Sequence, residues 1–176
     1  MQNSDLQQKR LIAAAIDIAI WLALFMAMSL VLLVLGAGVG FSDSSVARYL
    51  PRLGWFGVSL VLVAYVLGRD ILAGDRSIGK KLQHIRVVTG SGPIGLMESI
   101  KRNAIFAIGS VLVFVSSAVR LIPVLGDILS CLLWPLVVLG SLATVAATVI
   151  EFIKITQDPN GIRLGDQFAQ TNVVEE

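Results

Sequence analysis

The sequence has little of what a soluble enzyme or a metalloprotein requires. Its 176 residues include one cysteine, Cys131, and one histidine, His84. A single thiol cannot form an intrachain disulfide or a cluster of thiolate ligands, and a lone histidine does not predict a metal site. Charged residues make up only 15% of the chain, whereas they make up about a quarter of a soluble domain. We therefore expect no metal, no cofactor and no water-soluble fold.

Hydrophobic residues, in contrast, are abundant. They form 56% of the chain, and the mean hydropathy is +0.83. A transmembrane helix needs about 20 mostly apolar residues, and the chain offers four such runs: residues 11–36, 53–73, 104–125 and 128–152. The sequence therefore predicts an all-α transmembrane fold, a four-helix membrane bundle that occupies residues 1–176 as a single domain.

The placement of positive charge predicts the orientation of these spans. Eleven Lys and Arg residues lie before the first span, between the second and third, or after the fourth, and three lie on the other side. Lys and Arg collect in cytoplasmic loops. Both termini and the loop 74–103 should therefore be cytoplasmic.

This loop and the C-terminal tail should form a small cap on the bundle. Residues 82–88 are β-branched enough for a strand, and residues 89–93 read as a turn. The tail 171–174 also reads as a strand. We expect it to pair with residues 85–88, beneath the helices.

Two charged residues in the first apolar run raise the main question. Arg10 and Asp17 are seven residues apart, so on a helix they share one stripe, about 10 Å apart along the axis. With Arg10 at the cytoplasmic interface, Asp17 would lie about a third of the way into a hydrocarbon layer roughly 30 Å thick. Its carboxylate should point into the bundle and be satisfied by groups from other spans. Asp17 is then either a proton or cation relay or a structural hydrogen-bonding element.

The stretch GDRSIGKK, residues 74–81, has the G-x-x-x-x-G-K spacing of a phosphate-binding loop. Its eighth position is Lys81 where that loop has Ser or Thr, and it follows a membrane helix where that loop follows a buried strand. We therefore expect no nucleotide hydrolysis. Four cations lie in or near this stretch: Arg76, Lys80, Lys81 and Arg86. They can be interpreted as a solvated positive loop or as a site that binds phosphate or anionic lipid headgroups.

The fourth span contains small residues at intervals of four. Gly140, Thr144 and Thr148 would lie on one face of a helix, and small residues let membrane helices approach closely. They predict a helix contact, either within the chain or between copies of a homo-oligomer.

Four stretches of the sequence resemble the RDD family of bacterial membrane proteins, which is named for one arginine and two aspartates. They are RLIAAAID from Arg10, GDRSIGKKLQHIRVV from Gly74, KRN from Lys101 and RLGDQFAQTNVV from Arg163. The resemblance makes Arg10 the arginine and Asp17 and Asp166 the aspartates. The chain has Gly165 where the family commonly has histidine, and Ala169, Gln170, Thr171 where it commonly has Ala-Gly-Thr.

The resemblance implies a multi-pass protein of the bacterial inner membrane that transports ions or small ligands, since some members are described as sodium/proton antiporters. It also places Asp166 beside the first span, where we expect an ion pair with Arg10. The leading hypothesis is a small transporter or conduit, cation- or proton-linked, and not an enzyme. The alternatives are a non-transporting scaffold or accessory subunit and a ligand sensor that uses the basic loop. The expected partners are the lipid bilayer, anionic headgroups and further copies of the chain, with no nucleic acid.

Overall fold

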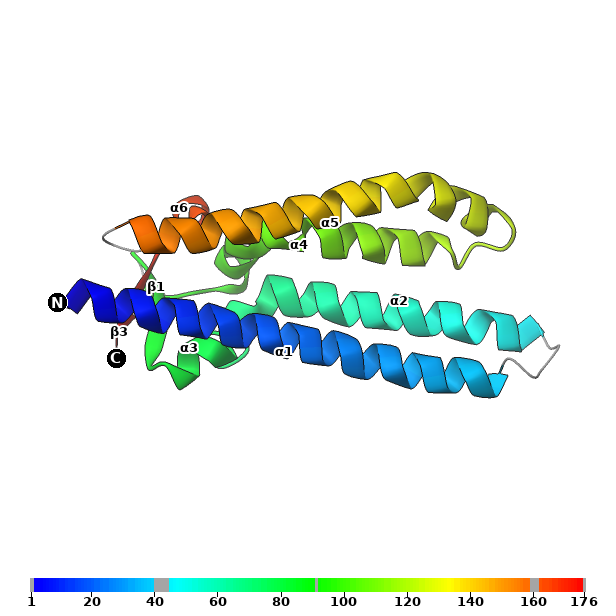
Figure 1. The fold of residues 1–176 in the computed structure, drawn as a ribbon, viewed down its shortest axis with the longest axis horizontal. Coiled ribbons are helices and arrows are strands. Elements are labelled where there is room, and N and C mark those ends of the chain that lie inside the picture. The colour runs from blue at the N-terminus through cyan, green and yellow to red at the C-terminus, as the bar shows by residue number, and fades with distance from the viewer. Residues whose placement is uncertain (1, 40–44, 91, 159–161, 176) are drawn as a thin grey trace.

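Four long helices run side by side along the length of the molecule (Figure 1). The computed structural model describes residues 2–39, 45–90, 92–158 and 162–175. The helices are α1 (Gln2–Val39), α2 (Ser45–Gly68), α4 (Leu96–Val119) and α5 (Leu125–Gln157). Each is long and apolar enough to cross a membrane.

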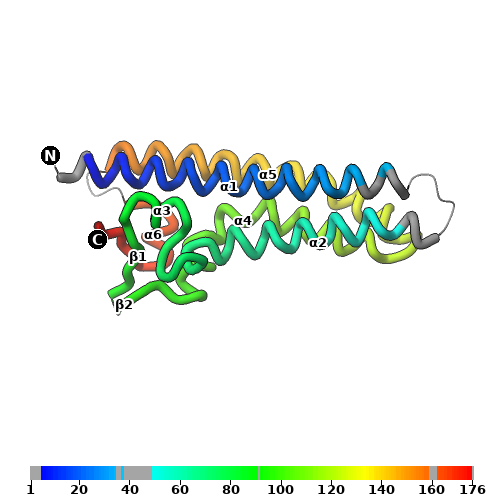
Figure 2. Tube along the Cα trace, turned by 90° about the horizontal axis from the view of Figure 1, so that it is seen from below, coloured from blue at the N-terminus to red at the C-terminus, as the bar shows by residue number. Residues whose placement is uncertain are grey.

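The helices differ in length, which decides where the cap sits. α1 has 38 residues and α5 has 33, whereas α2 and α4 have 24 each. At 1.5 Å per residue, 24 residues span about 36 Å, which is enough to cross the hydrocarbon layer. α1 and α5 therefore overhang α2 and α4 at the end of the bundle that carries both termini, here called the capped end (Figure 2).

The cap lies beneath these overhanging helices (Figure 2). From α2 the chain passes through a short 3-10 helix, η1 (Arg69–Ile71), to α3 (Ile78–Leu82), β1 (Ile85–Thr89) and β2 (Gly92–Pro93). After α5 it forms α6 (Leu164–Ala169) and β3 (Thr171–Glu175).

The three strands form one antiparallel sheet in the order β2-β1-β3. Val87 is opposite Val173, so the tail pairs with the segment that the sequence selects. The strand is shorter than the sequence suggests, because His84 has a positive φ of 52° and lies in the turn before β1. Ile85, Val87 and Val173 are buried against Ala13, and this small apolar core joins the sheet to α1.

α5 packs along α4 through small residues. A side chain added at Gly140 would clash with Leu112, and the Gly109 amide donates to the Thr144 hydroxyl at 3.0 Å. The small-residue stripe of the fourth span is thus a helix contact within the chain.

Candidate functional site

Asp17 receives its hydrogen bonds from the cap. The Ser77 hydroxyl donates to one carboxylate oxygen at 2.6 Å, and the Gly79 amide donates to the other at 2.9 Å. The side chain of Ser77 also accepts a hydrogen bond from the Lys80 amide as the N-cap of α3. Asp17 is only 3% exposed. It therefore points inward, as expected, but groups from α3 satisfy it, and not groups from other spans.

Asp17 lies at the level of the last turn of α2. The Tyr65 hydroxyl donates to the backbone oxygen of Asp17 at 3.3 Å, and Tyr65 lies one turn before α2 ends at Gly68. Asp17 is therefore near the end of the short helices, and not a third of the way along them. The expectation assumed that the interface lies at Arg10, whereas α1 overhangs its neighbours there.

The GDRSIGKK stretch, residues 74–81, packs α3 against α1. Gly79 lies so close to α1 that an added Cβ would collide with the carbonyl oxygen of Ala13 and approach Asp17. A glycine is needed because only a bare backbone can bring the Gly79 amide to the Asp17 carboxylate. The spacing that resembles a phosphate loop thus serves the contact between α3 and α1.

Asp70 is the centre of a second set of contacts. It lies in η1, is fully buried, and forms ion pairs with Lys80 and, at 3.4 Å, with Arg102. The Asn103 amide donates to Asp70 at 2.9 Å, and the Asn103 oxygen accepts from Arg69 at 2.8 Å. These contacts join η1, α3 and α4.

Asp166 is the centre of a third set. It lies in α6, is 1% exposed, and is 2.6 Å from Arg102, 3.4 Å from Arg10 and 3.6 Å from Arg163. Glu151 of α5 lies 3.7 Å from Arg163 and accepts from the Gly165 amide at 3.1 Å. Arg102 therefore connects Asp166 to Asp70. The buried charges of α1, α4, α5 and the cap form one ionic network.

The network shifts the proton affinities of the groups in the cap. Burial raises the pKa of Asp166, but Arg102, Arg163 and Arg10 outweigh this effect, and the net pKa is lowered. Burial lowers the pKa of Lys80 to about 7; Arg102 acts in the same direction and Asp70 opposes it. Asp166 is therefore ionised at neutral pH.

A small cavity of about 20 Å³ lies within the network, with space for about one water molecule. Ala14, Ile85 and Val173 form its apolar wall. Its polar wall is mostly cationic and consists of Arg10, Asp17, Arg69, Lys80 and Arg163.

The structure brings Arg10, Asp17 and Asp166 together but separates the four cations of the loop. Lys80 is 5% exposed and paired with Asp70, so it does not share a solvent-facing surface with the others. Arg76 is partly buried beside Asp75, at 3.2 Å. Lys81 and Arg86 are exposed. The interpretation of Lys80 as part of a solvated loop is therefore wrong, because its ammonium is buried in an ion pair with Asp70.

Sequence reasoning missed most of the network. Arg102, Arg163 and Glu151 were given no role. A signal was present for Glu151, since an acid within an apolar run is the pattern that singled out Asp17. Arg102 and Arg163 lie in stretches that carry the family resemblance.

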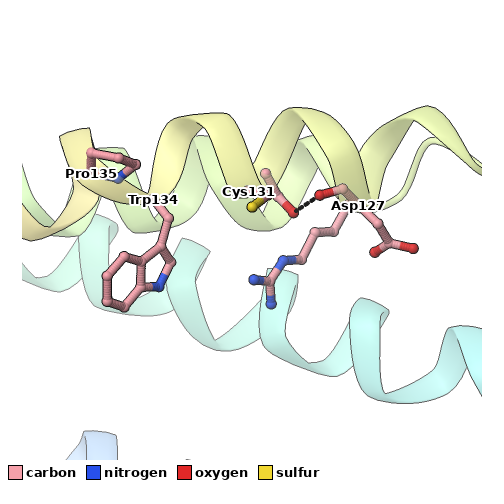
Figure 3. A pocket seen from close by; sticks show the side chains of 6 residues that line it. Asp127, Cys131, Trp134 and Pro135 are labelled. Atoms are coloured by element: carbon pink, nitrogen blue, oxygen red, sulfur yellow. Dashed lines mark hydrogen bonds between the residues drawn. The ribbon is translucent and has the colours of Figure 1, made fainter.

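A larger hollow of about 350 Å³ lies at the opposite end of the bundle, along the first turns of α5 (Figure 3). Asp127, Cys131 and Trp134 line it from α5, together with Arg120. Arg52 of α2 lies 2.8 Å from Asp127 and bridges this end of the helices. The hollow is open and the charge of Asp127 is paired.

A protein-family model described as the RDD family matches residues 7–170. The chain belongs to the RDD family. The match includes all four spans and the parts of the ionic network around Asp70 and Asp166. Comparisons with curated proteins and with solved structures gave no match.

Two departures from the common RDD pattern can be read from the geometry. An added Cβ at Gly165 would clash with the backbone oxygen of Arg102, so a histidine here would require α6 to shift away from α4. Gln170 has φ 52° and ψ 46°, the left-handed conformation that glycine adopts most easily. The common glycine of RDD proteins at this position suits the turn between α6 and β3.

Proposed function

We propose that this RDD protein is a small transporter or conduit for an ion or small solute, and that the ionic network closes its cytoplasmic end. One observation carries the proposal: a buried set of ion pairs joins α1, α4, α5 and the cap, which continues directly from α2, at one end of a mostly apolar bundle. Buried ion pairs are a weak source of stability. Charged groups within membrane spans commonly mark ion pathways.

The role of Asp17 in this proposal differs from that of a simple cation relay. Both of its oxygens are occupied by the Ser77 hydroxyl and the Gly79 amide. A cation could reach the carboxylate only after α3 has moved away. Asp17 is therefore a latch for the cap, and release of the latch opens the cytoplasmic end.

The proposal includes the orientation and the surroundings of the protein. The capped end, with both termini, faces the cytoplasm of a bacterial inner membrane, because eleven of the fourteen Lys and Arg residues are on that side. Lys81 and Arg86 are exposed and contact anionic headgroups. The protein is not an enzyme. Further copies of the chain associate through exposed apolar helix faces.

Reconstituted liposomes test the proposal and separate the latch from the relay. Gradients of protons, sodium, potassium and chloride are imposed on vesicles that contain wild type, Asp17→Asn or Ser77→Ala. If Asp17 is a latch, both substitutions change flux in the same direction, since each removes part of the same contact. If Asp17 relays a cation, Asp17→Asn abolishes flux and Ser77→Ala does not.

Ser59→Ala is the matched control. Ser59 is a buried serine that forms a 2.7 Å hydrogen bond to Ser117, between α2 and α4 and away from the cap. Its replacement should leave flux unchanged. Absence of flux above empty vesicles under every gradient would overturn the transport proposal.

A scaffold or accessory subunit is the second candidate. It is favoured by apolar side chains that the cap leaves in the open: Phe168 is 73% exposed and Leu82 is 60% exposed. Such residues suit a contact with another membrane protein. Purification in a mild detergent tests this role, which requires a larger complex that Phe168→Ser disrupts.

A further inference from the structure

The cavity at the capped end has an unusual electrostatic lining. Four of its side chains are cations, on α1, η1, α3 and the residue that precedes α6: Arg10, Arg69, Lys80 and Arg163. Three of them, Arg10, Lys80 and Arg163, are at least nine-tenths buried. Like charges in so confined a space repel one another unless anionic groups offset them.

The carboxylate in the lining cannot fully offset these charges. Asp17 is the one carboxylate that lines the cavity within the described ranges. Its oxygens already accept from Ser77 and Gly79. Asp158 also acts on Arg10, but from outside the lining. The cavity itself therefore has a positive potential.

Arg69 differs from the other basic residues of the lining. Its Nε donates to the neutral Asn103 side chain, and its guanidinium lies 5.6 Å from the centre of the Phe106 ring. In the part of the chain that the structure describes, it has no ion pair. The other cations of the network have carboxylate partners: Arg10 and Arg102 have Asp166, Lys80 has Asp70, and Arg163 has Glu151.

We propose that this cavity binds one small monovalent inorganic anion of about the size of chloride. The ion contacts the cationic side chains of Arg10, Arg69, Lys80 and Arg163 and offsets the charge that Arg69 adds. The apolar wall of Ala14, Ile85 and Val173 suits a weakly hydrated halide. A cavity of about 20 Å³ is too small for sulfate or phosphate, each of which has five heavy atoms.

The anion completes the ionic network and holds the cap against α1. It binds to the folded protein and not to the unfolded chain, so it raises the melting temperature with the logarithm of its concentration once that concentration exceeds the half-saturation value. This site does not depend on the transport proposal. An anion can bind here in a protein that moves nothing across the membrane.

Thermal unfolding of the purified full chain in one detergent tests the site. Sodium chloride, bromide, gluconate and sulfate are compared at constant ionic strength and pH, and tryptophan fluorescence reports unfolding. Chloride and bromide should raise the melting temperature with the logarithm of their concentration above half-saturation, by about 5 °C or more at a hundredfold excess. Gluconate and sulfate should not.

Two arginine variants distinguish the site from a general salt effect. Arg69→Gln removes the positive charge at position 69 and keeps an amide that can donate to Asn103, so its melting temperature should no longer respond to chloride. Arg52→Gln, at the opposite end of the bundle, should respond as wild type does. Equal stabilisation by gluconate, or an unchanged chloride response in Arg69→Gln, would overturn the proposal.

A measurement on wild type alone guards against a variant that fails to fold. Bound chloride broadens the chlorine-35 NMR line of free chloride, and bromide should reverse the broadening by competition while gluconate does not. Absence of protein-dependent broadening would also overturn the proposal. Flux experiments test the transport proposal separately. Chloride binding without flux would support the anion site and contradict the transport proposal.

Discussion

The Ser77 hydroxyl donates a 2.6 Å hydrogen bond to Asp17, although 60 positions separate them in the chain. This bond fixes the cap to the first helix at the level where α2 ends. It gives the aspartate of the first span a structural partner from outside the spans. A carboxylate that looks stranded in an apolar run is thus satisfied by a loop that folds back over it.

Replacing the two partners of this bond should have non-additive effects. Asp17→Ala leaves the buried Ser77 hydroxyl and the Gly79 amide without an acceptor and should lower the free energy of unfolding by about 2–4 kcal/mol. Ser77→Ala also removes the N-cap of α3 and should cost about 1–2 kcal/mol. The double variant should cost less than the sum by about 0.5–3 kcal/mol.

Denaturant unfolding of the purified variants in one detergent measures this cycle. Ser130→Ala serves as the control, because the Ser130 hydroxyl donates to the Asp127 carbonyl within α5, at the opposite end of the bundle from the cap. Additive losses would show that the bond does not couple α1 to α3.

Gly79→Ala should displace the cap. The added methyl group would collide with the Ala13 carbonyl oxygen, and backbone atoms cannot rotate out of the way. Such overpacking costs about 1–3 kcal/mol. Gly57→Ala is the matched control, since a Cβ at Gly57 meets nothing within 4 Å and alanine favours the helix. The melting temperature should fall for Gly79→Ala and stay level or rise for Gly57→Ala; equal responses would contradict the close contact.

The sequence was sufficient for the spans and for the strand pairing. Apolar runs located the four helices because a membrane span must be apolar over about 20 residues. The β-branched segments near Val87 and Val173 identified the two strands that pair. Their register follows from the small core that they share with Ala13.

The site was harder to predict, for two physical reasons. The overhang of α1 beyond α2 depends on how the helices pack, so the level of Asp17 could not be read from the length of one run. The partners of Asp70 and Arg102 depend on the folding back of α3 and α6, and sequence separation hides these contacts. Lys80 shows the same limit: a lysine in a basic loop reads as solvated until Asp70 is placed beside it.

Asp166→Ala should destabilise the protein more than Arg10→Met does. Asp166 faces Arg102, Arg163 and Arg10, and its removal leaves several buried guanidinium groups without their carboxylate. Breaking a buried ion pair from one side costs about 3–5 kcal/mol. Arg10→Met leaves Asp166 paired with Arg102 and Arg163, so this substitution should lower the free energy of unfolding by less.

The double variant Arg10→Met with Asp166→Ala sharpens this prediction. An isolated pair would recover stability when both charges are removed, whereas here Arg102 and Arg163 have each still lost a carboxylate, so most of the loss should persist. Denaturant unfolding compares the three variants. Full recovery in the double variant would mean that Arg102 does not depend on Asp166.

The lowered pKa of Asp166 predicts how stability responds to acid. The carboxyl is more acidic in the folded protein than in the unfolded chain, where its pKa is near 3.8. Its contribution is therefore fully present above that unfolded value and is lost as the pH falls through the lower, folded value. The melting temperature of wild type should fall below about pH 4. The melting temperature of Asp166→Asn should be lower than that of wild type at pH 7. It should also fall less on acidification, because an asparagine at position 166 cannot take up a proton. Melting curves between pH 7 and pH 3 test this, and parallel curves for the two proteins would show that Asp166 is not ionised within the network.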